Sequence, residues 1–281
     1  MRTLMVLLGF FFGASVLGQS TVFNSAFKGN FFIQAGSSMQ FFNPSTLRFT
    51  GNNFDFSLNN ARLTSLNRLV GGGDKHAILT SAYSLEVGHN IKRGVMLSAN
   101  IDQMGYGLQN QTLEVTGSIA PGIDQLSGLP ETSNQTLVSM DSIGFNVEIS
   151  RSNRFSINLN LCQNLYRTTK RGFVLNAVYG FSAGVIHSTS TITFGNALQP
   201  SIKSLSGISA SANAGLRFEF LRHFYLLTQL SGVLLSNHNI RLDLSDGSQA
   251  LKGNLLYGQT TVFIGSIFSL KNRKSCDCPK F

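Results

Sequence analysis

The chain has 281 residues, a formal net charge of +9 and a charged-residue share of 12%, against 42% hydrophobic residues. That charged share is about half that of an ordinary soluble domain, and the scattered basic residues give no strong case for nucleic acid binding. After residue 18 no apolar run reaches the roughly 20 residues that a membrane helix needs. Low charge with abundant Gly, Ser, Asn and Phe is typical of a membrane β-barrel, and a secreted all-β protein is the alternative.

Residues 1–18 have the features of a secretory signal peptide. Arg2 supplies the positive start, Leu4–Phe12 is the apolar stretch, and a small-residue cleavage site ends at Gly18. No cysteine lies at that site, which argues against a lipoprotein anchor. We therefore expect the chain to be exported and to fold beyond the inner membrane.

Eight stretches of the mature chain alternate between apolar and polar residues, which is the period of a β-strand. In the clearest of them Ile208 and Phe218 lie on the apolar face and Arg217 lies on the polar face. Strands of a soluble sandwich are usually shorter, about 5–6 residues, so these stretches favour strands that cross a bilayer. In chain order the predicted strands cover residues 30–40, 78–90, 95–106, 155–164, 173–187, 207–221, 224–236 and 255–270.

The predicted connections alternate in length. Short turns follow the second, fourth and sixth strands, at Lys92-Arg93-Gly94, Thr168–Gly172 and Leu221-Arg222-His223, and the other connections are longer. In bacterial outer-membrane barrels the short turns lie on the periplasmic side and the long loops lie outside. The sequence therefore predicts an all-β fold: an eight-stranded antiparallel transmembrane β-barrel with short periplasmic turns and longer extracellular loops. We expect it to be a monomer in the cell outer membrane.

The two longest connections, 41–77 and 107–141, are the candidate sites of contact with a protein partner. The first holds two alternating arms around Gly51-Asn52-Asn53, a pattern typical of a β-hairpin. The second begins with Asn110–Ile119, which still alternates, so the third strand is predicted to project past the membrane. Aromatic residues of the hairpin form a candidate loop contact surface: Phe49, Phe54 and Phe56. The alternative is that these rings form an outer aromatic girdle and a core within the loop.

Three stretches, Leu47–Arg62, Asn110–Ile119 and Ala214–Gly232, resemble a family of small outer-membrane β-barrel proteins of the Bacteroidota, with the barrel architecture of OmpX and OmpW. The resemblance runs through most of the mature chain at low identity. It implies an outer-membrane location, with outer-membrane lipid and lipopolysaccharide as partners, and it implies no activity. The chain departs from the family in having no Trp and in ending with a tail beyond the last strand.

Four charged residues are predicted to point into the barrel: Glu86, Asp102, Arg217 and Glu219. Eight strands leave an interior just wide enough for side chains to fill it, so charges there must be paired. We expect a structural ion-pair network around Arg217. The alternative is a path for protons or ions.

The sequence also offers a weak match to an enzyme. Some small barrels that this chain resembles are lipid A deacylases, which place a His and a Ser two residues apart near the outer rim. The nearest match is His187-Ser188-Thr189-Ser190, where Thr189 stands in place of the Ser and no acidic partner is evident. His238 is a similar rim histidine. We therefore expect no enzyme activity and no catalytic residues.

Cysteine usage predicts neither a disulfide framework nor a metal site. The three cysteines are Cys162, which alternates onto the inner face, and Cys276 and Cys278 in the tail. A Cys-X-Cys pair alone is a poor metal signature, so no metal and no cofactor are predicted. The expected organisation is a barrel over residues 19–271 and a basic, cysteine-containing tail over residues 272–281.

These features predict a barrel with a filled polar interior and a structural or interaction role through its extracellular loops. Two alternatives stay open. One is a narrow channel for small or apolar solutes, and the other is a lipid A-modifying hydrolase at the rim.

Overall fold

The computed structural model describes most of the expected barrel. The described residues are 29–51, 54–66, 82–108, 110–119, 132–140, 145–168, 173–194, 197–198, 201–220, 224–241 and 250–269. The expected signal peptide and the expected tail, with Cys276 and Cys278, lie outside them.

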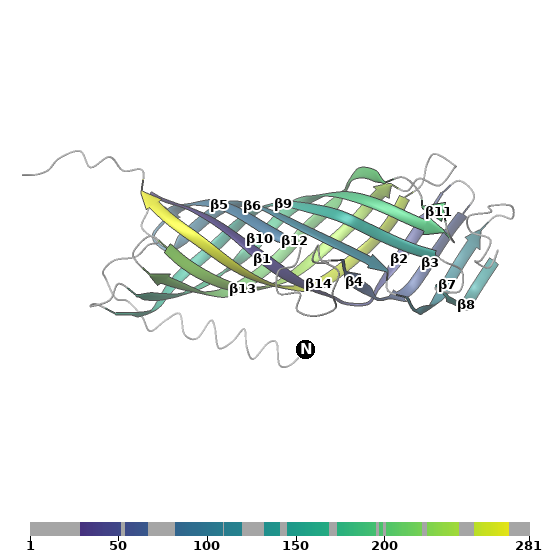
Figure 1. Cartoon of the computed structure of the whole chain (residues 1–281), viewed down its shortest axis with the longest axis horizontal. Coiled ribbons are helices and arrows are strands. Elements are labelled where there is room, and N and C mark those ends of the chain that lie inside the picture. Colours follow the sequence, from purple (N-terminus) through teal and green to yellow (C-terminus); the bar gives the residue numbers. More distant parts are fainter. Residues whose placement is uncertain are drawn as a thin grey trace, which may run out of the picture.

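Eight long antiparallel strands close into a ring (Figure 1). Closure comes from β14 and β1, which pair from Asn30↔Ser269 to Phe42↔Tyr257. These eight strands correspond to the eight predicted ones, so the prediction of an all-β antiparallel ring is confirmed. In ring order they are β1 (Asn30–Phe42), β5 (Tyr83–Lys92), β6 (Val95–Leu108), β9 (Phe145–Arg167), β10 (Val174–Phe194), β12 (Ile202–Phe220), β13 (Phe224–Arg241) and β14 (Ala250–Ser269).

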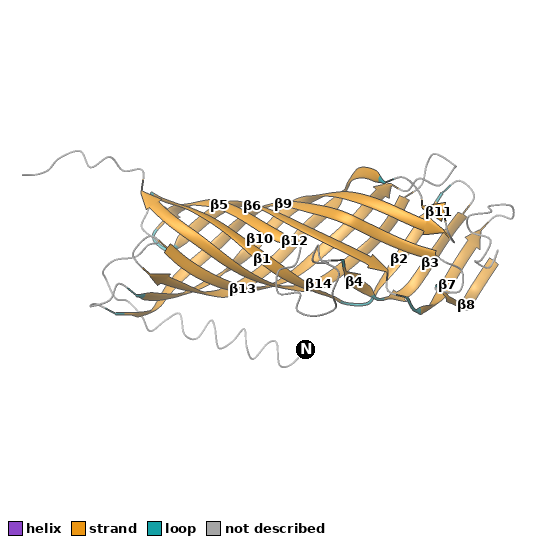
Figure 2. Ribbon diagram, in the orientation of Figure 1, coloured by secondary structure: helices purple, strands orange, loops and turns teal. Residues whose placement is uncertain are grey.

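Six shorter strands complete the sheet, and most of them extend one end of the ring, on the right in Figure 1 and Figure 2. They are β2 (Ser45–Thr50), β3 (Phe54–Ala61), β4 (Leu63–Ser65), β7 (Thr112–Ile119), β8 (Thr132–Ser139) and β11 (Ala197–Leu198). Beyond the ring the strand order runs β14-β2-β3-β7-β8, which we call the outer sheet. The predicted hairpin is confirmed as β2 and β3, which pair from Ser45↔Ala61 to Thr50↔Asp55.

The outer sheet grows out of ring strands that continue past the ring. After β1 the chain passes Pro44 and resumes as β2, which pairs with the start of β14 at Arg48↔Lys252. After β6 it resumes as β7, which pairs with β3. The stretch predicted to continue the third strand past the membrane forms the separate strand β7, whose partner is β3 and not a ring strand.

The side chain of Gln111 bridges the two chain segments at the point where the strand partners change. At the break between β3 and β4, the Gln111 amide accepts from the Arg62 backbone N–H at 3.2 Å and donates to the Arg62 carbonyl at 2.9 Å. Gln111 thus replaces the backbone bonds that a regular ladder would make there. β4 then pairs with β6 at Tyr106–Leu108, beyond the point where β5 begins.

Several ring strands are longer at the outer-sheet end than the sequence predicts. The strand predicted over 155–164 is β9 over Phe145–Arg167, and the strand predicted over 173–187 is β10 over Val174–Phe194. A bulge at Ser150 separates the missed part of β9 from the predicted part, because Thr189 pairs with Arg151 whereas Ser190 pairs with Ile149. The bulge changes which positions face inward: Val147 and Ile149 are buried before it, and Ser156 and Asn158 are buried after it. A strict period of two does not anticipate a bulge, and the polar Arg151 and Asn153 interrupt the run of apolar residues on that parity.

The exterior of the ring is apolar around its whole circumference. Large hydrophobic side chains are exposed on every ring strand, up to 72% for Phe181. One example from each strand, in ring order, is Ile33, Leu85, Leu97, Ile157, Phe181, Ile208, Leu230 and Ile264. Among the described residues, no helix is long and apolar enough to cross a membrane.

The interior is filled in three layers. An inner apolar layer fills the end with the short turns and contains Phe32, Met96, Val178, Tyr225, Leu227, Phe263 and Ile267. A polar layer follows, described below. An outer apolar core then joins the ring to the outer sheet, and its largest members are Phe49, Phe54, Phe56, Met104, Tyr106, Met140 and Tyr257.

Glycines shape the inner apolar layer. A Cβ on Gly88 would lie 2.2 Å from the Phe32 ring, and one on Gly265 would lie 2.2 Å from the Tyr225 ring. Each aromatic side chain therefore packs against the backbone of a glycine, at a position where any Cβ would clash with it.

Candidate functional site

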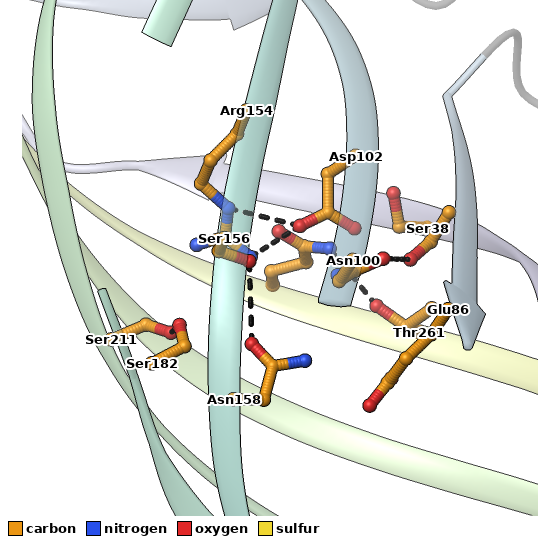
Figure 3. A network of polar contacts seen from close by, with 12 residues as sticks. Ser38, Glu86, Asn100, Asp102, Arg154, Ser156, Asn158, Ser182, Ser211 and Thr261 are labelled. Carbon is orange, nitrogen blue, oxygen red and sulfur yellow. Dashed lines mark hydrogen bonds and ion pairs between the residues drawn. The ribbon is translucent and has the colours of Figure 1, made fainter. Parts of the chain in front are cut away.

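The polar layer of the ring contains a buried ion pair and a buried carboxylate (Figure 3). Arg154 on β9 donates through Nε to Asp102 Oδ2 on β6 at 2.9 Å, with a second, shorter contact from Nη2. Glu86 on β5 accepts hydrogen bonds from Gln34 Nε2 at 2.6 Å and from the Ser98 hydroxyl. Both carboxylates thus have the donors that a charge removed from water requires.

Serine and asparagine side chains line the rest of this layer. Ser156 donates to Asn158 Oδ1 at 3.3 Å, and the Ser182 and Ser211 hydroxyls lie 2.5 Å apart (Figure 3). These residues follow from the strand period, because every second residue of β9, β10 and β12 points inward.

A second ion pair lies nearer the inner apolar layer. Arg217 Nε lies 3.0 Å from Glu219 Oε1 on β12, and Asn176 Nδ2 donates to the same oxygen at 2.7 Å. The Arg217 guanidinium lies 4.1 Å from the centre of the Tyr225 ring, an energetically favourable cation–π contact. The Tyr225 hydroxyl in turn donates to Gln34 Oε1 at 2.8 Å. Gln34 therefore links the Arg217 group to Glu86.

The structure places all four predicted interior residues, Glu86, Asp102, Arg217 and Glu219, inside the ring and buried. The network does not centre on Arg217 alone, because Asp102 pairs with Arg154, a residue the sequence reading did not include. Arg154 precedes the predicted start of its strand at residue 155. The signal was present nevertheless, since Arg154 has the same parity as Ser156 and Asn158.

The polar layer leaves little room for solvent. Its cavity, lined by residues such as Glu86, Asp102, Arg154 and Asn213, has a volume of about 10 Å³ open to the centre of a water molecule. That is space for about one water. Arg154 Nη1 and Asn213 Oδ1 are buried there without a hydrogen-bond partner in the described part of the chain. A single bound water would satisfy either atom, but nothing in this layer resembles a continuous aqueous path.

The three rings expected to form a loop contact surface are buried, which corrects that expectation. Phe49, Phe54 and Phe56 are 1%, 4% and 2% exposed, and the Phe49 and Phe56 rings stack with their centres 4.9 Å apart. In water a two-stranded hairpin needs an apolar face to pack against, and these rings supply it. The alternative combined an outer aromatic girdle with a core within the loop, and the burial of these rings supports the core and not the girdle.

A polar groove opens on the outer sheet at the break between β3 and β4. It has a volume of about 380 Å³ open to water, in contrast to the nearly closed interior. The loop 41–77 supplies one wall and the loop 107–141 supplies the other. Its lining residues are Asn59, Asn60, Arg62, Asn110, Gln111, Thr112, Leu113, Glu114 and Leu137. Amides, a guanidinium and a carboxylate can hydrogen-bond to the hydroxyls of a sugar or to the backbone of a peptide.

The hydrolase candidate finds no support in the geometry. His187 and Thr189 point outward, whereas Ser188 points into the ring and accepts from Ser206 at 2.7 Å. His187 has no ion pair or hydrogen bond with any described carboxylate. Among the described residues, the hydrogen bonds of the His238 ring are with Ser236 of its own strand, through the carbonyl at 2.9 Å and the hydroxyl at 3.5 Å. Neither histidine is thus oriented by an acid, as a nucleophile's base would be.

Cys162 is a free thiol that faces the interior and packs against the inner apolar layer. Among the residues that the structure describes, no group of three or more His, Cys, Asp and Glu could hold a metal ion.

Solved structures of outer-membrane proteins are similar to the chain at low identity. The attachment invasion locus protein Ail of Yersinia pestis is 11% identical, with a TM-score of 0.34, over 86% of this chain and 99% of that one. The outer membrane protein OprG from Pseudomonas aeruginosa is 10% identical, with a TM-score of 0.39, over 86% of this chain and 97% of that one. AlkL, solved in DMPC lipid bilayers, is 10% identical, with a TM-score of 0.37, over 92% and 97%.

No family model matches the chain, and no curated protein matches it. At these identities and TM-scores, the likeness to solved structures decides nothing about the activity or partners of this chain.

Proposed function

We propose that the chain is an integral outer-membrane β-barrel protein with a filled interior and a structural or interaction role carried by its outer sheet. The observation that carries the proposal is the reversal of polarity along single strands. On β9, Ile157 faces outward and Asn158 inward, whereas nearer the outer sheet Glu148 faces outward and Ile149 inward. An apolar exterior suits lipid and a polar exterior suits water, so the reversal marks a membrane boundary.

The dimensions of the ring support a membrane placement. A tilted strand crosses the hydrocarbon layer in about 9–11 residues. β5 has 10 residues and the other ring strands have 13 to 23, so each is long enough. The closed ring also leaves no unpaired strand edge to lipid, which the bilayer core requires.

The interior supports a role other than conduction. Apolar layers lie on both sides of the polar layer, and the polar layer itself has room for about one water. The channel alternative would need these layers to open. The rim hydrolase alternative would need an acid beside His187, and the described residues supply none.

The groove between the two long loops supports an interaction role. It is a water-exposed hollow on the outer sheet, and it is formed by residues of both 41–77 and 107–141. These are the loops expected to meet a protein partner. We keep membership of the Bacteroidota barrel family as part of the proposal, on the stretches that resemble it.

The test is single-channel conductance of the purified mature chain in a planar bilayer. Insertion is verified separately by heat-modifiable mobility on gels, so that a silent bilayer with inserted protein is distinguishable from failed insertion. We expect no steady openings. Steady openings from the inserted chain would contradict the filled interior and make solute passage the working function.

A further inference from the structure

Two basic side chains flank a threonine on the outer surface of three neighbouring strands. In the register of the sheet, Thr189 on β10 lies opposite Arg151 on β9 and opposite Lys203 on β12. All three point outward, because Ser152, Ser188 and Ser204 beside them are buried in the interior. Arg151 and Lys203 are exposed to solvent.

Neither cation is neutralised within the described part of the chain. Arg151 and Lys203 take part in no ion pair there. The nearest outward carboxylate on the same strand, Glu148, lies further out, opposite Thr191, and is not paired with Arg151. By contrast, Arg48 on the hairpin lies 2.6 Å from Asp55 and is neutralised by it. Within the described residues, the cluster of Arg151, Thr189 and Lys203 therefore has two positive charges without an ion-pair partner.

The cluster lies where the apolar exterior ends. One row closer to the short turns, the outward residues are Asn153, His187 and Leu205, which lie opposite one another. The following row is fully apolar and exposed: Phe155 at 43%, Val185 at 45% and Ile208 at 59%. A membrane that covers the apolar row places its headgroups at the height of the cluster.

The spacing suits a single phosphate. Neighbouring strands lie about 4.8 Å apart, so the backbones of Arg151 and Lys203 are separated by about 10 Å with Thr189 between them. Two long side chains can converge over the threonine from that distance. A guanidinium offers paired N–H donors to phosphate oxygens, an ammonium adds a point charge, and the hydroxyl adds a third donor.

We propose that Arg151, Thr189 and Lys203 bind the phosphate of a lipid headgroup in the outer leaflet, a phosphorylated glycolipid such as lipid A. This rests on the proposed outer-membrane placement. Asn153 and His187 then lie below the phosphate, where the sugar of the headgroup meets the acyl chains. The exposed Leu205 contacts those chains.

The experiment compares lipid binding by the full mature chain folded in a neutral detergent. The variant Arg151→Gln with Lys203→Gln removes both charges without altering the interior. The matched control, Lys92→Gln with Arg93→Gln, removes the same charge at a short turn on the opposite end of the ring. The probes are phosphorylated lipid A, chemically dephosphorylated lipid A and inorganic phosphate, and binding is followed by native mass spectrometry.

We expect the wild type and the control to bind phosphorylated lipid A at least about tenfold more tightly than the dephosphorylated form, since each lost charge-assisted bond costs about that factor. The Arg151/Lys203 variant should lose this preference. Equal binding by wild type and variant would overturn the proposal. Competition by millimolar inorganic phosphate would overturn the lipid as the source of the phosphate.

Heat-modifiable mobility in lipid vesicles keeps this test separate from the proposed function. A chain that never inserts refutes the outer-membrane placement. A chain that inserts but binds both forms of lipid A equally refutes the phosphate site alone.

Discussion

In the ring, Asn158 points inward and Ile157 outward, whereas in the outer sheet Phe56 points inward and Asp55 outward. The two regions share strand geometry and differ in what surrounds them. Where the exterior is apolar, the interior contains the hydrogen-bonded polar layer beside the inner apolar layer, and where the exterior is polar, the interior is a packed apolar core. Along the same strands, the inward face that carries the polar layer in the ring carries the apolar core in the outer sheet.

This comparison shows how one continuous sheet can be stable in two solvents. In the ring most large apolar side chains face outward, and the interior combines ion pairs and amides with the inner apolar layer. In the outer sheet, burial of apolar surface from water supplies the stability, as in an ordinary soluble domain. Variants in the two regions should therefore fail for different reasons.

The largest effect is expected from breaking the buried pair of the ring. Arg154→Ala leaves Asp102 buried without its partner, and removal of one member of such a pair typically costs about 3–5 kcal/mol. The free energy of unfolding, measured by guanidinium titration in lipid vesicles, should fall by that order. Arg241→Ala is the matched control, because Arg241 is an exposed arginine on β13 outside the proposed phosphate site, and it should change little. An equal loss of unfolding free energy in both variants would contradict a special role for the buried pair.

In the outer sheet the corresponding variant is Phe56→Ala. It removes a ring that is 2% exposed and should cost about 3 kcal/mol. Because Phe56 lies beyond the ring, we expect protease cleavage within the hairpin while the heat-modifiable ring persists. Collapse of the whole ring in this variant would mean that the two regions are not separable.

Much of this arrangement could be predicted from the sequence, and the limits have a physical cause. Alternation located all eight ring strands because lipid on one side and polar groups on the other impose a strict period of two. It left open whether Phe49 and Phe56 form a contact surface or a core, because the period alone does not say which face of the hairpin is covered. It omitted Arg154 because the partner of a buried carboxylate depends on the register between strands far apart in sequence.

The reversal of polarity can be tested by placing an outward-facing lysine in each region and comparing the loss of stability. Phe181→Lys sets a charge near the middle of the apolar exterior and should lower stability in lipid by about 2 kcal/mol or more. Ser57→Lys sets the same side chain outward on β3, where water is expected, and should have little effect. The measurement is again unfolding in vesicles, and a larger loss for Ser57→Lys would reverse the assignment.

The smallest effect concerns the exposed pair of the hairpin. Hydrogen bonds from Arg48 lower the pKa of Asp55 below its ordinary value, and the charge of Arg48 adds to this. A carboxyl with a lowered pKa stabilises the folded state above its unfolded pKa of about 3.9, and this contribution is lost as pH falls through the lower folded value. Because both groups are exposed, the effect is small.

We therefore expect hairpin protection, measured by hydrogen exchange, to be flat from neutral pH down to about 4 and to decline only below that. Asp55→Asn should remove the decline. A marked loss of protection in the wild type between pH 7 and 5 would contradict this account of the pair.

The most direct test of the reversal is a spin-label scan along β9, which runs through both regions. Labels are placed one at a time at positions 148, 151, 155, 157 and 159 in a chain whose three cysteines are replaced by serine, reconstituted in vesicles. The outward residues Phe155, Ile157 and Leu159 should be accessible to oxygen dissolved in lipid, and Glu148 and Arg151 to a water-soluble nickel complex. Access of the nickel complex at all five positions would contradict the membrane placement and the reversal of polarity that supports it.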